Sequence, residues 1–222
     1  MTTAEKLSKV YEGVEKTEAL NAELEQALYG TSEGVKSFYD EFWDAFQKNG
    51  TRTDYRYAFF VNWDDNTYNP KYDIVCVGMA NSAFGACKIT DTKRAIDITG
   101  ATDTNGFFSD ADKLVTIRKL IVSEATPIAT NFMGWMPLLE NLEIEGTIGC
   151  SFGAKYSTKL SKASITSIIN ALSTTTEGLT VTLSKAAVNK AFETSECAND
   201  GEFSAEWDEL EKSREDWTIS LV

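Results

Sequence analysis

The middle of the chain repeats its apolar pattern at a constant interval. Steps of 24 residues from Phe84, in the stretch AFGAC, reach an aromatic residue each time. The aromatic residues in this register are Phe60, Phe84, Phe108, Phe132 and Tyr156. Pairs of mostly apolar residues, spaced two apart, follow the first four aromatics: Tyr72 and Ile74, Ile96 and Ile98, Leu120 and Val122, Ile144 and Gly146. This spacing predicts that each pair forms the inward face of a short strand.

Further columns in the same register strengthen the repeat. Three residues after the first four aromatics come Trp63, Cys87, Ala111 and Trp135. Six residues after the later aromatics come Leu114 and Leu138, whereas Thr90 holds that position in the AFGAC unit. One strand and turn cannot bury its apolar face alone, so stacked units would share continuous packed columns. A period in the twenties with one strand per unit is typical of leucine-rich repeats. The sequence therefore predicts an α/β fold with a short parallel β-solenoid over residues 55–160, with a period of about 24 residues.

Cys87 could be a reactive thiol or a packing residue. It shares its column with Trp63, Ala111 and Trp135, and a thiol required for chemistry would not occupy a packing position of this kind. We interpret Cys87 as a small buried hydrophobic residue rather than a nucleophile.

The repeat ends after Tyr156, and residues 161–222 predict an α/β C-terminal cap. Ser161 or Ser164 can N-cap a helix, and Ser184 can begin a second one. The first helix would bury Ile165, Ile168, Ile169 and Leu172, and the second Ala187, Val188, Ala191 and Phe192. Alternating apolar residues predict strands at Leu179, Val181 and Leu183 and at Trp217, Ile219 and Leu221, and Trp207 with Leu210 marks a short helix between them.

The first 30 residues show a heptad pattern, which predicts an N-terminal helix. Its a and d positions are Leu7, Val10, Val14, Thr17, Asn21, Leu24 and Leu28. Two interpretations remain open: a coiled coil that joins copies of the chain into a homo-oligomer, or a single amphipathic helix packed on its own domain. Residues 31–54 predict a helical N-terminal cap, because Val35, Phe38, Tyr39, Phe42, Trp43 and Phe46 recur at helical spacing.

Composition limits the chemistry and the partners. A net charge of -13 would repel phosphate backbones, so we expect no nucleic-acid partner. No apolar run has the length of a membrane span, and MTTAEKLSKVYEGVEK lacks the apolar core of a secretory signal peptide. We therefore expect a chain that stays in the cytoplasm or leaves it by a route that needs no signal peptide, such as inside a virion. The absence of histidine excludes Ser-His-Asp and Cys-His catalysis and imidazole metal sites, and we expect no catalytic residues, no metal and no cofactor.

Acidic residues are the remaining candidates for a site. Asp103, Asp110 and Asp112 could bind a divalent cation, but DTNGFFSDAD lacks EF-hand spacing, so solvated turns are the preferred interpretation. Cys76, Cys87, Cys150 and Cys197 contain no CxxC pair and are expected to be reduced. If a partner surface exists, the outward strand residues would be Asp73, Asp97, Ile121 and Glu145.

Two stretches, NSAFGAC and TNFMGWMPLLENLEIEG, resemble the units of bacterial BspA-like leucine-rich repeats. Ala111 and Trp135 depart from that pattern, which usually has Cys there. The stretch TVTLSKAAVNKAF and the terminal WTISLV resemble the C-terminal block of leucine-rich-repeat proteins from phages and prophages of gut Firmicutes. The resemblance implies a non-catalytic tail or baseplate-associated virion component that recognises a protein or a host surface. A bacterial adhesin is the alternative, followed by a carboxylate-dependent or cation-binding enzyme.

Overall fold

The computed structural model of the chain describes residues 54–60, 63–66, 68–70, 72–192 and 204–222. All of them belong to the compact unit Gly50–Val222. The predicted N-terminal helix, its seam of Leu7, Val10, Val14, Asn21, Leu24 and Leu28, and nearly all of the predicted cap at 31–54 lie outside the described residues.

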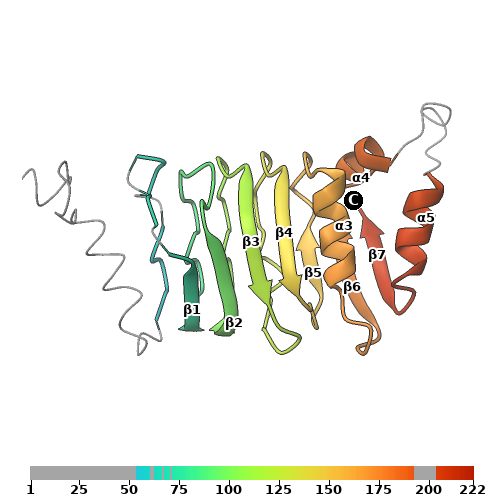
Figure 1. Cartoon of the computed structure of the whole chain (residues 1–222), viewed down its shortest axis with the longest axis horizontal. Coiled ribbons are helices and arrows are strands. Elements are labelled where there is room, and N and C mark those ends of the chain that lie inside the picture. Colours follow the sequence, from blue (N-terminus) through green and yellow to red (C-terminus); the bar gives the residue numbers. More distant parts are fainter. Residues whose placement is uncertain (1–53, 61–62, 67, 71, 193–203) are drawn as a thin grey trace, which may run out of the picture. The chain divides into compact units, whose positions relative to one another are not determined.

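Four parallel strands form the first sheet: β1 (Ile74–Met79), β2 (Ala95–Asp103), β3 (Thr116–Val122) and β4 (Asn141–Gly146). They lie in sequence order and side by side (Figure 1). Ile96 pairs with Leu120, and Leu120 pairs with Ile144, so the predicted 24-residue step relates hydrogen-bonded neighbours. Ile96, Ile98, Leu120 and Val122 are buried, as the two-residue alternation predicts.

The turns that carry the aromatic residues also bond to one another. The N–H of Phe84 donates to the carbonyl of Phe107 at 2.8 Å, and the N–H of Phe108 donates to the carbonyl of Phe132 at 2.9 Å. The Phe84, Phe108 and Phe132 side chains are fully buried, with ring centroids 5.4 and 5.6 Å apart along the column. The predicted aromatic column is confirmed at these three positions.

At both ends of the column the predicted residue is wrong. Phe59, not Phe60, stacks on Phe84 with ring centroids 4.4 Å apart, and its N–H donates to the carbonyl of Ala83. Phe152 follows Phe132 at 6.3 Å, whereas Tyr156 is 41% exposed. The reason is that the step changes from 24 to 25 residues at one end and to 20 at the other.

The columns that contain Tyr72 and Trp135 also depart from the 24-residue period. Tyr72 is exposed because β1 first pairs Ile74 with Ile96, and irregularities later in β1 restore the 24-residue offset. Trp135 is 52% exposed, and Met136 is buried in the core instead.

At two further positions, the buried residue is the neighbour of the one that the 24-residue period points to. Ile89 and Leu139 are buried, whereas Thr90 is exposed and Leu138 only half-buried. Gly146 ends β4 on the surface with φ of +100°, a conformation that glycine adopts without strain.

A second parallel sheet follows, formed by β5 (Phe152–Ala154), β6 (Leu179–Leu183) and β7 (Trp217–Leu221) in that order. The helices are α3 (Lys162–Ala171), α4 (Lys185–Phe192) and α5 (Ala205–Lys212). Ser161 is the N-cap of α3, where its Oγ accepts from the N–H of Ser164. These elements confirm the order of helices and strands predicted for the C-terminal region.

Helix α3 covers the last strand of the first sheet. The N–H of Leu142 donates to Ser164 Oγ, and the N–H of Ile144 donates to Ser167 Oγ, both at 2.8 Å. An uncovered edge strand would leave these groups free to pair with another chain. Across the described residues the fold is α/β with parallel sheets. No helix among them is long and apolar enough to span a membrane.

Candidate binding surfaces

The outward row of the first sheet gathers three of the four predicted partner-facing residues. Asp97 pairs with Ile121, and Ile121 pairs with Glu145. Asp73 is not in this row, because Val75 is the residue of β1 that pairs with Asp97. Asp73 precedes β1, and its Oδ1 accepts from the N–H of Ala95 at 3.1 Å.

Charged side chains at the β4 end of this row are paired. Lys119 Nζ lies 2.8 Å from Glu145 Oε2 and 3.3 Å from Glu143 Oε1. The hydrogen bonds that Lys119 donates to these carboxylates, together with their negative charge, raise the pKa of Lys119. Away from the β4 end, the Arg118 guanidinium contacts both oxygens of Asp91, which precedes β2. Local pairing therefore partly neutralises the acidic end of the face.

The β1 end of the same face is apolar. Val75, Val77 and Met79 are 44%, 40% and 40% exposed. We define the outer sheet face as Val75, Val77, Met79, Asp97, Ile121 and Glu145. The apolar end was missed by the sequence analysis, although IVCVGM lacks the outward charges that alternate in NLEIEG of β4.

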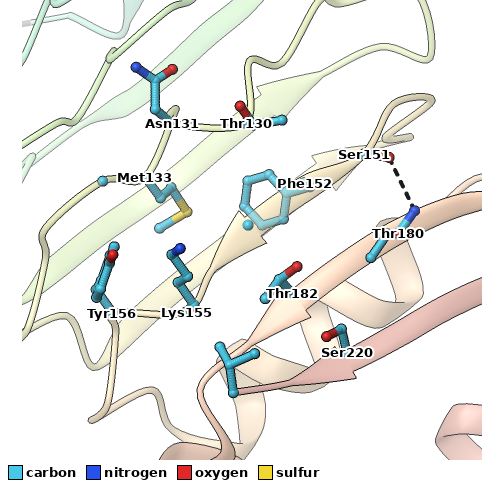
Figure 2. Close-up of a pocket in the computed structure, with 13 residues that line it drawn as sticks. Thr130, Asn131, Met133, Ser151, Phe152, Lys155, Tyr156, Thr180, Thr182 and Ser220 are labelled. Carbon is cyan, nitrogen blue, oxygen red and sulfur yellow. Dashed lines mark hydrogen bonds between the residues drawn. The ribbon is translucent and has the colours of Figure 1, made fainter.

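A groove of about 660 Å³ lies over the second sheet (Figure 2). The described residues that line it are Thr130, Asn131, Met133, Gly134, Ser151, Phe152, Gly153, Lys155, Tyr156, Thr180, Thr182, Ser220 and Val222. Ser151 Oγ accepts from the N–H of Thr180 at 3.1 Å, and Asn131 Oδ1 accepts from the N–H of Gly106 at 3.2 Å. No sequence motif marked this groove, because the residues that line it are up to 92 positions apart in the chain, from Thr130 to Val222.

The described cysteines are protected thiols. Cys76 and Cys87 are buried, and Cys150 is half-buried. Burial raises the pKa of all three thiols, that of Cys87 to about 12. Since the thiolate is the nucleophilic form, these side chains are poorly suited to covalent chemistry near neutral pH. The packing interpretation of Cys87 agrees with its complete burial.

The acidic turns hold local partners. Asp103 Oδ1 accepts from the N–H of Asn105, and Ser109 Oγ lies 3.3 Å from Asp110 Oδ2. Lys88 Nζ pairs with Asp112 at 3.0 Å and lowers the pKa of that carboxyl group. Within the described part of the chain, no three acidic or thiol side chains are placed to share a metal ion.

No protein-family model, curated protein or solved structure matches the chain. The resemblance to BspA-like repeats and to phage proteins therefore stays a prediction. Arguments about function rest on the geometry of the chain itself.

Proposed function

We propose that the chain is a non-catalytic structural and binding protein that presents its outer sheet face to a protein partner. The observation that carries the proposal is the exposed apolar row of Val75, Val77 and Met79 along β1. Ile121 of β3 adds an apolar side chain to the same face, two strands away and separated from Val75 by Asp97. Contiguous exposed apolar surface costs solubility and is typical of interaction sites. The paired charges around Lys119 would form the polar rim that such an interface needs.

A leucine-rich-repeat-like solenoid is the architecture that we infer for residues 55–160. Bonded neighbours are offset by 22 to 26 residues in the strands and turns, and by 24 or 25 residues in isolated bridges such as Asp64 with Lys88 and Asp91 with Thr116. Stacked units of this kind expose one residue of each strand in a continuous row, and repeat proteins use such rows for binding. The solenoid inference and the binding surface therefore support each other.

The biological setting that we propose is a phage or prophage particle, where the chain would be a tail or baseplate-associated component. This part rests on the resemblance of the repeats and of the C-terminal block. The partner would be another virion protein or a protein of the host surface, and copies of the chain would associate through residues 1–30.

The test is mass spectrometry of purified particles from a host that carries the gene. We expect the chain in the particles, and we expect the double variant Val75→Glu, Ile121→Glu to be depleted about tenfold or more. Glutamate at these two positions would place unpaired charge at the centre of the interface. The control variant Thr218→Glu alters an exposed residue of β7, away from this face, and should be retained.

Two results would overturn the proposal. One is absence of the wild-type chain from particles. In that case, detection of the chain on the outside of phage-free cells would favour the alternative that it is a bacterial adhesin. The other is unchanged incorporation of a double variant whose circular dichroism spectrum matches the wild type.

A further inference from the structure

The groove over the second sheet presents hydroxyl groups without partners. Thr180 and Thr182 lie on β6 and Ser220 lies on β7, and all three line the groove (Figure 2). Among the described residues, their side-chain oxygens have no hydrogen-bond partner, although the strands that carry them pair with each other in the sheet. Such hydroxyls can both donate and accept, which suits a ligand that carries many hydroxyl groups itself.

One aromatic ring, Tyr156, lines this groove, and Trp135, which is not among the lining residues, packs against Tyr156. Trp135 and Tyr156 are 52% and 41% exposed, with ring centroids 5.3 Å apart and planes at 51°. The repeat would place both in core columns, yet Met136 and Phe152 occupy the core instead. The shift in step that moves them outward therefore creates an aromatic platform beside the polar groove.

The charge of the groove differs from that of the chain. The sequence has 34 acidic residues, yet the described residues that line the groove include no aspartate or glutamate. Lys155 Nζ lies over the Tyr156 ring, 4.9 Å from its centroid, and forms no ion pair with the described residues. A cation in this setting is available to an anionic group of a ligand.

We propose that this groove binds an oligosaccharide, with a carboxylate-bearing sugar preferred over a neutral one. The apolar C–H faces of sugar rings would stack on Trp135 and Tyr156, as apolar groups pack on exposed aromatic faces. Thr180, Thr182 and Ser220 would exchange hydrogen bonds with sugar hydroxyls, and Lys155 would pair with the carboxylate. The volume of about 660 Å³ is within the range of roughly 300–1,000 Å³ typical of small-ligand sites.

An extended peptide fits the groove less well. Peptides that bind sheets usually add a strand at an edge, where unpaired N–H and carbonyl groups are offered. The groove lies over the face of β5, β6 and β7, where Thr180, Thr182 and Ser220 are among the residues that line it. The site is separate from the outer sheet face, so its outcome does not depend on the function proposed above.

The experiment is a calorimetric titration of the full chain with hexagalacturonate as the acidic probe and maltohexaose as the neutral one. We expect saturable binding with at least a tenfold preference for the acidic probe at low salt. Trp135→Ala should weaken binding of the acidic probe at least tenfold, because it removes half of the platform. Lys155→Gln should abolish the preference while leaving the weaker affinity for maltohexaose in place.

Matched controls separate the site from the fold. Tyr72→Ala removes another exposed aromatic, next to β1 in the first sheet, and should leave both affinities unchanged. Melting temperatures of all variants should remain within a few degrees of the wild type. Absence of saturable sugar binding would overturn the proposal. Sugar binding that Trp135→Ala leaves unchanged would also overturn it, as would a groove that binds an unrelated peptide but neither sugar.

Discussion

The middle of the aromatic column and the C-terminal end of the first sheet differ in how their backbone groups and apolar side chains find partners. In the middle, Phe84 and Phe108 come from neighbouring turns that carry an aromatic residue at the same position, and each turn bonds to the next. At the end no further copy of the strand exists, and α3 lies beside β4 instead. A repeated unit is satisfied by its neighbours, whereas the last unit needs side chains chosen for its own exposed groups.

The end region shows how many special contacts such a boundary requires. The Arg214 guanidinium donates to the carbonyls of Leu172 and Asn170, which end α3. The indole N–H of Trp217 donates to the carbonyl of Ser173 at 2.8 Å. These bonds pair carbonyl groups that the last turn of a helix leaves without partners. The middle is thus held by repetition and the end by individual side chains.

The largest effect should come from the middle of the column. Phe84→Ala removes a fully buried ring that contacts Phe59 and Phe108, and we expect a loss of about 3–5 kcal/mol in the free energy of unfolding. Tyr156→Ala is the matched control, since it alters an aromatic of the same 24-residue register that faces solvent, and it should change stability by less than about 0.5 kcal/mol. Urea titrations would measure both, and equal effects would contradict the column.

A smaller effect is expected where α3 covers β4. Ser164 is buried, and its Oγ accepts from the N–H of Leu142 and donates to the carbonyl of Glu140. Ser164→Ala should cost about 1–3 kcal/mol, because it leaves a buried N–H without a partner. Thr166→Ala, in the same helix and without a side-chain hydrogen bond among the described residues, should stay within about 0.5 kcal/mol. If the two variants unfold at the same urea concentration, the hydrogen bond from Leu142 to Ser164 does not stabilise the edge of the sheet as we predict.

The smallest effect should depend on pH. Glu124 accepts hydrogen bonds from the hydroxyls of Ser173, Thr175 and Thr176 at 2.5, 2.6 and 3.0 Å. These bonds lower the pKa of Glu124 below its ordinary value of 4.5, so its contribution to stability is present above that pH and is lost as the pH falls through the lowered pKa.

The variant Glu124→Gln should therefore melt at a lower temperature than the wild type at pH 7, and the gap should close as the solution is acidified below pH 4.5. Glu177→Gln changes an exposed carboxylate of the nearby loop that has no side-chain partner among the described residues, and should show no such gap. A gap that persists or widens in acid would contradict the sign of the pKa shift.

Much of the fold could be predicted from local pattern. Phe84, Phe108 and Phe132 were assigned correctly because each ring packs against the aromatic ring one 24-residue step along the chain. The helices after Ser161 and Ser184 were also assigned correctly, since a capping serine before an apolar stripe is a local signal. Errors gathered where the step changes by one residue or more, as at Tyr72, Trp135 and Tyr156, because a fixed period cannot detect such slips.

The candidate sites divide in the same way. Asp97, Ile121 and Glu145 were predicted as neighbours because the strand register follows the period. The groove was not predicted, because Asn131 and Ser220 come together only when β5, β6 and β7 pair.

By itself the sequence determined the period, the middle of the buried aromatic column and the order of the C-terminal elements. The first two follow from contacts between neighbouring units, and the third follows from local capping and alternation signals. Tertiary structure alone decided that Met136 rather than Trp135 is buried, that α3 covers β4, and that distant hydroxyls share one groove. The physical reason is that burial at an irregular step depends on the space left by packed neighbours, and this space is a property of the assembled chain.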